Sequence, residues 1–338
     1  MPRKRIGKDL TLRQQERIRV MRAARSNRAG RNEIQQAMDL GPEEEGRVMA
    51  HFGLNVEVEN PQGMRFRCAV RETLQEDPVC GDQVIWRRVG EQAQGVIVGV
   101  QPRQTVLQRP GPYQRLLTVA ANVDRIVVVT ASGTPNPGLL DRYLAAAEKA
   151  RIEAILVVNK SDQGANRHLE EEMLEPYVRM GYPVFWTSAL LGSGLTSLEE
   201  ALRDVTSVLV GESGVGKSSL VNCWTKDAVL KTAEVHAGTG QGRHATTTAQ
   251  LYRLPGGGFL IDSPGVREFG LHGVEREAVP GLFRDVVPFL GKCRFSNCQH
   301  GQEPDCALRA AVLAGAIAPA RLAGMLRIME SVPPRNPY

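Results

Sequence analysis

The sequence predicts a multidomain protein that combines a small β-barrel, an α/β domain with a phosphate loop, and a mostly α-helical C-terminal domain that binds zinc. Three observations lead to this fold class. Short alternating runs, separated by turn residues, fill positions 41–110. A glycine-rich G-x-x-x-x-G-K-S motif follows an apolar run in the middle of the chain. Three cysteines and one histidine gather between Cys293 and Cys306.

The positive charge of the chain is concentrated in a basic N-terminal arm, residues 1–40. Residues 1–31 hold 11 Lys and Arg against Asp9 and Glu16, whereas the whole chain has a formal net charge of +5. Residues 11–28 lack proline and glycine, which predicts a helix whose apolar stripe is too weak to pack on a core. Arginines without aromatic residues favour phosphate contacts, so this arm is expected to bind RNA. The alternative is a solvated arm without a partner.

Composition argues against a membrane or secreted protein. No apolar run approaches the roughly 20 residues of a membrane span, and residues 1–10 lack a secretory apolar segment. The six cysteines are irregularly placed, which predicts a reducing, cytoplasmic setting.

The barrel is predicted over residues 41–110. Partly alternating runs at 48–59, 64–70, 83–89 and 95–100 are separated by turn residues. About five strands in this length suit a small barrel, although the pattern does not select one type. Cys68 and Cys80 are expected to be core or surface thiols.

Residues 111–272 are predicted to form a doubly wound α/β sheet. Its buried strands are expected at 125–130, 154–158, 207–210 and 258–261. Asn136 and Pro137 predict the start of a helix over 138–150. Ser197 and Glu200 predict a capping box that opens the helix before the phosphate-loop strand.

A guanine-reading motif, NKSD, follows the strand at 154–158. The carboxylate of Asp162 can accept from N1–H and the exocyclic amine of guanine, a pair of donors that adenine lacks. Thr187-Ser188-Ala189 resembles a companion loop whose Ala189 N–H would meet guanine O6. The predicted guanine contacts are Asn159, Lys160, Ser161, Asp162, Ser188 and Ala189.

The phosphate loop GESGVGKS comes after the guanine motif. Its backbone N–H groups would turn toward the phosphates, Lys217 would reach the terminal phosphates, and the Ser218 hydroxyl would ligate Mg²⁺. The following helix adds its N-terminal dipole to anion binding. The predicted contacts of the loop are Gly211, Glu212, Ser213, Gly214, Val215, Gly216, Lys217, Ser218 and Ser219.

The motif DSPG stands third, at residues 262–265. Asp262 is placed to reach Mg²⁺ through water, and the Gly265 N–H is placed to bond a γ-phosphate. A polar, glycine-rich stretch at 238–248 precedes this motif and is typical of a switch segment. Thr246 or Thr247 would supply its Mg²⁺ ligand, and the sequence does not choose between them.

The C-terminal domain is predicted over residues 273–338. Cys293, Cys298, His300 and Cys306 offer three thiolates and one imidazole, which is a closed tetrahedral set for one structural zinc ion. Residues 307–325 are apolar and are expected to form helices beside this site.

The permuted motif order, with GESGVGKSSL, GRHATTTAQLY, DSPGVREFGL and the Cys/His cluster, resembles the RsgA (YjeQ) family of circularly permuted GTPases, and the resemblance extends from the N-terminus to about residue 310. It implies an OB-type barrel and a cytoplasmic, monomeric protein that uses GTP, GDP and Mg²⁺. It also implies ribosome-dependent GTP hydrolysis on the small ribosomal subunit and its rRNA late in assembly, with release after hydrolysis. Ala245 departs from the threonine that the family usually has there.

The group that orients the attacking water is the least determined part of the site. Val266 occupies the position after the DSPG glycine, where many GTPases have glutamine, and valine cannot orient water. The remaining residues are His244, Gln241 and Arg267, and the resemblance favours His244 as the catalytic residue. Two other functions stay open: a non-catalytic guanine-nucleotide-binding RNA scaffold, and a permuted GTPase that serves the large subunit or another RNA.

Overall fold

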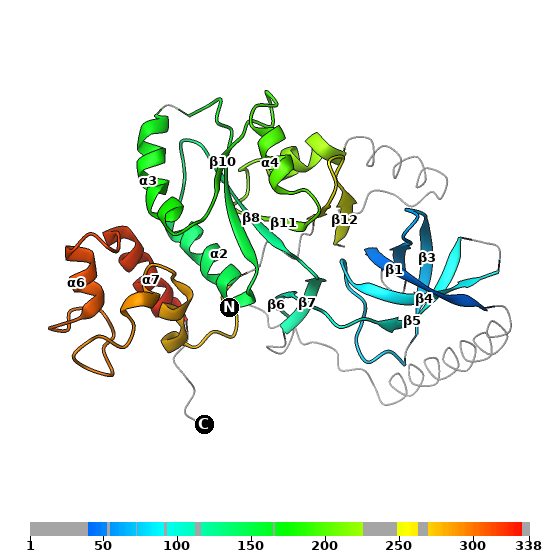
Figure 1. The fold of residues 1–338 in the computed structure, drawn as a ribbon, viewed down its shortest axis with the longest axis horizontal. Coiled ribbons are helices and arrows are strands. Elements are labelled where there is room, and N and C mark those ends of the chain that lie inside the picture. Colours follow the sequence, from blue (N-terminus) through cyan, green and yellow to red (C-terminus); the bar gives the residue numbers. More distant parts are fainter. Residues whose placement is uncertain are drawn as a thin grey trace, which may run out of the picture.

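The computed structural model describes residues 40–332, apart from 53–54, 72, 91–92, 112–115, 165, 226–248 and 263–269. The predicted arm helix at 11–28 and the predicted switch segment at 238–248 lie outside the described residues. Figure 1 shows three parts in chain order: a barrel, a central α/β domain, and a helical C-terminal part that packs on the central domain.

The first part is a closed barrel of five strands. Its strands are β1 (Leu40–Phe52), β2 (Asn55–Glu59), β3 (Arg65–Val70), β4 (Gln83–Val89) and β5 (Gln94–Val100). They pair in the order β1-β2-β3-β5-β4, and β4 returns to β1, with β3 and β5 parallel. This arrangement is the five-stranded Greek-key barrel of the OB type. Cys68 is fully buried in its core with Trp86, and Phe66 stacks on Trp86 at 4.5 Å.

A two-stranded ribbon, β6 (Val106–Pro110) and β7 (Leu116–Ala121), connects the barrel to the central domain. The sequence pattern did not indicate this ribbon. Its outer residues are only partly covered, whereas Leu107 and Ala120 are buried in the core.

The central sheet has the strand order β10-β9-β8-β11-β13-β12. Its strands are β8 (Arg125–Ala131), β9 (Glu153–Asn159), β10 (Val184–Trp186), β11 (Thr206–Val210), β12 (Gln250–Arg253) and β13 (Phe259–Asp262). All neighbours are parallel except β12 and β13. The four predicted buried strands are confirmed: β8, β9 and β11 cover their predicted ranges, and β13 begins one residue later than predicted.

Helices cover both faces of this sheet. Alternate residues of β8 point to opposite cores: Ile126 and Val128 pack on the side of α2 (Pro137–Ala150) and α3 (Arg167–Arg179), and Val127 and Val129 pack on the side of α4 (Leu195–Ala201). The predicted start of α2 is confirmed, since the Asn136 side chain accepts from the Leu139 N–H at 3.3 Å.

The predicted capping box at Ser197 is wrong. Ser197 lies inside α4, whose N-cap is Gly194 with φ of +71° and no side-chain cap. A Cβ at Gly194 would collide with the Trp186 carbonyl, so the chain needs glycine there to turn tightly into the helix.

The barrel and the central domain share one continuous sheet. Ala50 of β1 pairs with Gln250 of β12, which joins the two parts into 11 strands. At the same boundary Arg253 forms an ion pair with buried Glu59 at 2.5 Å. The guanidinium groups of Arg47 and Arg253 lie 4.2 and 4.7 Å from the centre of the Phe259 ring. The barrel is therefore attached at the strand that directly precedes β13.

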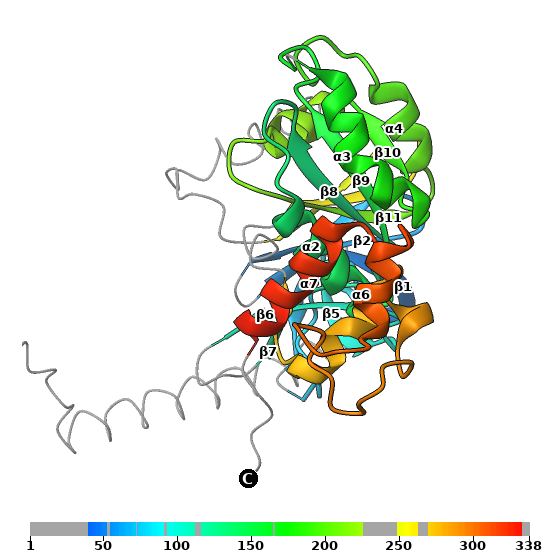
Figure 2. The same cartoon turned by 90° about the vertical axis from the view of Figure 1, so that its left-hand side faces the viewer.

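The C-terminal part consists of η3 (Arg276–Leu282), η4 (Val287–Phe289), α6 (Ala307–Leu313) and α7 (Pro319–Ser331). Both views show α7 beside α2 (Figures 1 and 2). Met325 of α7 and Leu144 of α2 lie in one hydrophobic core, which also contains Cys306. Among the described helices, none combines the length and apolar character needed to cross a membrane.

Candidate nucleotide-binding site

The phosphate loop leaves the carboxyl end of β11 and turns through three glycines with positive φ, namely Gly211, Gly214 and Gly216. A Cβ at Gly211 would collide with the Val129 carbonyl, and a Cβ at Gly216 would collide with the Asn159 amide. Glycine is therefore required at both positions, because the loop lies directly against β8 and β9.

Lys217 and Ser218 stand at the start of the helix that follows the loop, of which residues 217–225 are described. The Lys217 ammonium donates to the carbonyls of Gly211 at 2.8 Å and Glu212 at 2.5 Å, so it is folded back over the loop. Ser218 and Ser219 are exposed at the helix start, where unpaired N–H groups and the dipole favour a phosphate.

Asn159 fastens the phosphate loop to the guanine-reading loops. It ends β9 and is 1% exposed. Its Nδ2 donates to the Val215 carbonyl at 2.9 Å, and its Oδ1 accepts from the Thr187 hydroxyl and the Ala189 N–H, both at 3.2 Å. One side chain at the end of β9 thus bonds groups from two other segments that are far apart in the sequence.

Asp162 is oriented by its neighbour in the companion loop. The Ser188 hydroxyl donates to Asp162 Oδ1, and the Ser161 N–H donates to the Thr187 carbonyl at 3.0 Å. Lys160, between Asn159 and Ser161, adopts the left-handed region with φ of +59°. Among the described residues the bond from Ser188 engages Asp162 Oδ1, and because a carboxylate has about four acceptor sites, Asp162 keeps the capacity to accept from two guanine donors.

Asp262 is the last residue of β13, and β13 pairs in parallel with β11. The carboxyl ends of the two strands meet at one edge of the sheet, where ligands of open α/β sheets bind. The structure therefore brings Asp262 to the edge that carries the phosphate loop. Several predicted residues lie outside the described residues: Gln241, His244, Thr246, Thr247, Gly265, Val266 and Arg267.

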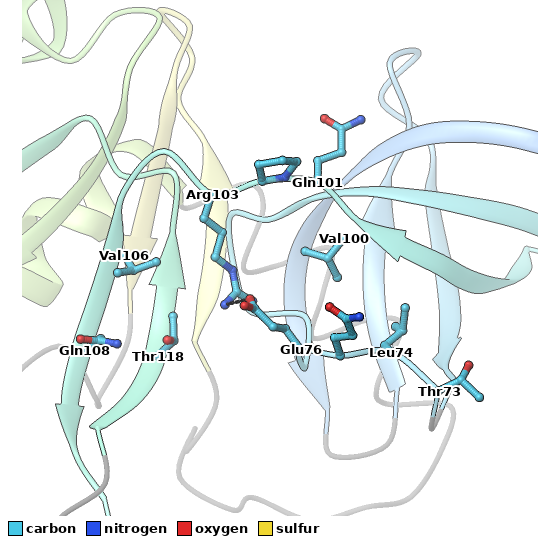
Figure 3. Close-up of a pocket in the computed structure, with 11 residues that line it drawn as sticks. Thr73, Leu74, Glu76, Val100, Gln101, Arg103, Val106, Gln108 and Thr118 are labelled. Carbon is cyan, nitrogen blue, oxygen red and sulfur yellow. Dashed lines mark ion pairs between the residues drawn. The ribbon is translucent and has the colours of Figure 1, made fainter.

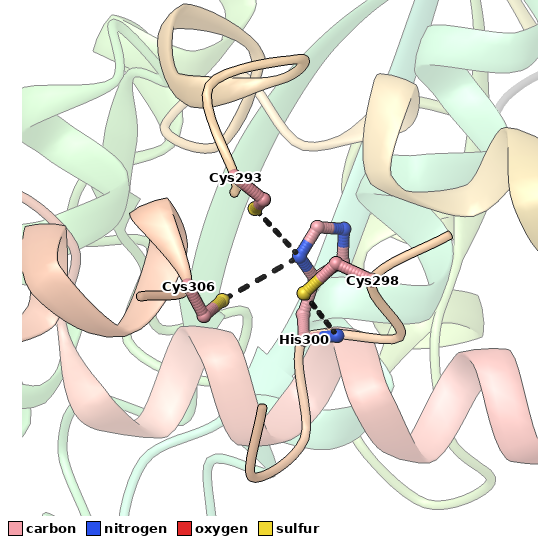
Figure 4. Close-up of side chains that lie close together, drawn as sticks. All are labelled: Cys293, Cys298, His300 and Cys306. Atoms are coloured by element: carbon pink, nitrogen blue, oxygen red, sulfur yellow. Dashed lines mark hydrogen bonds between the residues drawn. The ribbon is translucent and has the colours of Figure 1, made fainter. Parts of the chain in front are cut away.

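The Cys/His cluster is assembled in the C-terminal part as Figure 4 shows. The ligand atoms of Cys293, Cys298, His300 and Cys306 all lie within 4.8 Å of one another, so the cluster could hold a metal ion. His300 Nδ1 is 3.6 Å from the sulfurs of Cys293 and Cys306. In tetrahedral zinc, bonds of about 2.3 Å to sulfur and about 2.0 Å to nitrogen place the sulfur and nitrogen atoms about 3.5 Å apart.

Backbone N–H groups donate to two of the sulfurs in this cluster, although burial raises the pKa of the Cys298 thiol to about 11 in the absence of a metal. The His300 N–H donates to the Cys298 sulfur and the Ala307 N–H to the Cys293 sulfur, each at 3.4 Å. Burial lowers the pKa of His300, which favours the neutral imidazole that a metal requires. The donor set and its spacing therefore fit the predicted zinc ion.

Comparisons with known proteins show which family this chain resembles. Residues 100–272 match the model of the RsgA GTPase family. The small ribosomal subunit biogenesis GTPase RsgA of Pseudomonas aeruginosa (strain UCBPP-PA14) is 46% identical over 332 residues, which cover 96% of this chain and 97% of that protein. The protein of the same name from Marinobacter nauticus is 42% identical over 346 residues and covers 98% and 97%.

This chain belongs to the RsgA GTPase family. Among solved structures, YjeQ from Thermotoga maritima is 30% identical with a TM-score of 0.70, over 87% of this chain and 100% of that one. YloQ, described as a circularly permuted GTPase, is 26% identical with a TM-score of 0.67, over 87% and 98%. The predicted permuted fold and the prediction of a GTP hydrolase are thereby confirmed for this RsgA-family chain.

Two contacts of the phosphate loop in this RsgA-family chain were missed from the sequence. Asn136 Nδ2 donates to Glu212 Oε1 at 3.3 Å, and the backbone of Gly211 faces the Tyr143 phenol. Thr187 was likewise noted only as part of a loop, although it is fully buried against Asn159. Asn136 had a sufficient explanation as a helix cap, so no local signal indicated its second contact.

One described hollow lies apart from the nucleotide motifs. It has a volume of about 610 Å³ and lies between the barrel and the β6–β7 ribbon. Figure 3 shows Arg103 inside it, paired with Glu76 at 2.7 Å. Arg103 also makes two bonds of 2.8 Å to the fully buried carboxylate of Asp82. Because these bonds tie the segment after β5 back to the barrel, the hollow belongs to the connection between the two parts.

Proposed function

We propose that this protein binds GTP at the carboxyl edge of the central sheet, hydrolyses it, and acts in the biogenesis of the small ribosomal subunit. The observation that carries the nucleotide part is the position of Asn159, whose side chain joins the phosphate loop to both guanine-reading loops. The biological part rests on relatives, 46% identical over nearly the whole chain, that are named for this role.

In this proposal the guanine contacts are Asn159 to Asp162 with Ser188 and Ala189, and the phosphate contacts are residues 211–219 with Gly265. Ser218, Asp262 and either Thr246 or Thr247 would hold Mg²⁺, which neutralises charge on the phosphates when it is bound. Lys217 would leave the carbonyls of Gly211 and Glu212 and bond the terminal phosphates instead. His244 would orient the attacking water.

The finer biological scheme is inferred from the resemblance to the RsgA family. The domains are proposed as a basic arm (1–40), an OB-type barrel (41–110), the GTPase domain (111–272) and a zinc domain (273–338). The arm, barrel and zinc domain would contact rRNA of the nearly mature small subunit in the cytoplasm, as a monomer. Ribosomal contact would order the switch segment, and hydrolysis would release the protein.

The test is GTP hydrolysis by the full chain alone, with small ribosomal subunits, and with large subunits as the control. Stimulation by small subunits only is the expected result. Equal stimulation by both subunits would contradict specificity for the small subunit. Absent stimulation would contradict ribosome dependence and favour the non-catalytic RNA scaffold.

Two variants test the site itself. Asp162→Asn removes the acceptor for the guanine donors, so GTP affinity should fall while affinity for a xanthine nucleotide rises; unchanged preference for GTP would refute the guanine assignment. His244→Ala should lower the stimulated rate far more than Gln241→Ala, its matched control in the same segment. Equal rates in the two variants would exclude His244 as the water-orienting group.

A further inference from the structure

Helix α2 presents two carboxylates to the C-terminal part, seven residues apart and therefore on one helix face. The first is Asp141, which is 1% exposed. It accepts from the Tyr177 hydroxyl at 2.8 Å and pairs with Arg321 of α7. Arg321 also forms two bonds with Asp285, at 3.1 and 3.0 Å. We call Asp141, Tyr177 and Arg321 the inner triad.

The second carboxylate, Glu148, repeats this arrangement nearer the surface. Glu148 Oε1 accepts from the Tyr182 hydroxyl at 2.8 Å and from Arg284 Nε at 2.6 Å. The Arg284 guanidinium lies 4.2 Å from the centre of the Tyr182 ring, as Arg321 lies 5.1 Å from that of Tyr177. Glu148, Tyr182 and Arg284 form the outer triad. In both triads the acid and the tyrosine belong to the GTPase part, and the arginine belongs to the C-terminal part.

The same helix also contacts the phosphate loop. Its N-cap, Asn136, donates to Glu212, and Tyr143, which lies between Asp141 and Glu148 in the sequence, faces the backbone of Gly211. A 14-residue helix is a stiff element of about 20 Å, so these contacts and the two triads move together.

Helices α2 and α7 are closely packed where Gly324 faces Asp141. A Cβ at Gly324 of α7 would collide with Asp141 Oδ2, and this buried oxygen has no hydrogen-bond partner among the described residues. Closely packed helices do not shift by small, continuous displacements. If α7 moves relative to α2, we expect it to change to a second, distinct packing arrangement.

We propose that α2 and its two triads couple the state of the phosphate loop to the docking of the zinc-binding C-terminal part. This inference rests on the proposed binding of GTP and GDP at that loop. Asp141, Glu148, Arg284 and Arg321 are positioning residues that act through α2. This route is separate from the chain connection after Asp262, because it runs through side chains of α2 rather than along the backbone.

The first experiment uses the unaltered full chain with Mg²⁺. Amide hydrogen exchange in α7 is compared among the nucleotide-free, GDP-bound and non-hydrolysable GTP-analogue forms. Coupling predicts that exchange rates in α7 differ by about fivefold or more between the two bound forms. Equal α7 exchange in forms that demonstrably bind nucleotide would overturn the proposal. A chain that binds no guanine nucleotide would instead defeat the proposed function, and the coupling with it.

The second experiment assigns the route. Glu148→Gln weakens the outer triad at a residue that is partly exposed, so the chain is expected to fold. Glu175→Gln is the matched control, since it breaks the exposed Arg179–Glu175 pair within the GTPase part alone. The α7 exchange difference should fall below about twofold in Glu148→Gln and persist in Glu175→Gln. By reciprocity the ratio of GTP-analogue to GDP affinity should change by the same factor as the coupling. A full exchange difference in Glu148→Gln would refute the route through the triads.

Discussion

Replacing Asn159 is the sharpest test of how the nucleotide site is held together. Asn159→Ala removes one donated and two accepted hydrogen bonds at a side chain that is 1% exposed. It leaves the Val215 carbonyl and the Ala189 N–H without this partner. Each bond contributes about 0.5–1.5 kcal/mol net, and an orphaned buried group costs about 1–3 kcal/mol. We therefore expect the GTPase domain to lose about 3 kcal/mol of unfolding free energy.

The same change should weaken nucleotide binding, because the phosphate loop and the guanine loops lose their common anchor. A loss of about 2 kcal/mol in preorganisation corresponds to roughly a 30-fold lower affinity. Asn159→Asp should be worse than alanine, because it brings a carboxylate oxygen against the Val215 carbonyl, where the amide nitrogen now stands at 2.9 Å.

Urea unfolding and titration with a fluorescent GDP measure the two effects. Asn166→Ala is the control, since Asn166 caps α3 with one bond of 3.3 Å and is exposed. It should cost about 1 kcal/mol and leave the affinity unchanged. If Asn159→Ala behaves like this control, the side chain does not join the loops in solution.

Three further outcomes are expected. Burial, ahead of the neighbouring acids, raises the pKa of Tyr177 and Tyr182 above the ordinary value; their contribution to stability is complete below about pH 10 and is lost as the pH rises further. Absorbance at 295 nm should then show these tyrosines ionising only with loss of α2–α7 packing, and ionisation in a chain that keeps its native circular dichroism would contradict this. Chelation, or Cys306→Ser, should release one metal ion and lower the melting temperature, whereas Cys223→Ser keeps the metal in a chromogenic zinc assay; equal metal content in the two variants would exclude the cluster. Gly324→Ala should destabilise the C-terminal part by about 1–3 kcal/mol in thermal melts, because its Cβ meets Asp141, and an unchanged melt would show that the helices can separate freely.

Much of the fold could be predicted from local sequence patterns. The apolar strands before NKSD, the phosphate loop and DSPG are identifiable because buried parallel strands are apolar throughout. The Asn136-Pro137 start of α2 was visible because capping is a local interaction. The wrong prediction at Ser197 also came from a local pattern. The capping-box residues are present, but the tight turn at Gly194 begins the helix earlier.

The contacts between the parts could not be predicted. Arg321 and Asp141 look like surface charges in the sequence, and only the packing of α7 on α2 buries them together. The pairing of β1 with β12 joins residues that are 200 positions apart and consists of a single residue pair. The hydrophobic periodicity of the sequence therefore gives no sign of it. For the candidate site, the pattern identified residues that the fold gathers at one edge, but it could not show that Asn159 links them.

The position of β11 in the sheet has a consequence for synthesis of the chain. Among the strands of the central sheet, β8, β9 and β10 are synthesised first. β11, the partner of β8, follows roughly 75 residues after β8 ends. At about 5–20 residues per second, the valine-rich edge of β8 stays without that partner for roughly 4–15 s. An open parallel edge of this kind is prone to mispairing. The barrel, whose strands are all made by residue 100, can close long before then. When β12 is synthesised and the nucleotide site is completed, β1 of the folded barrel is therefore already available to pair with β12.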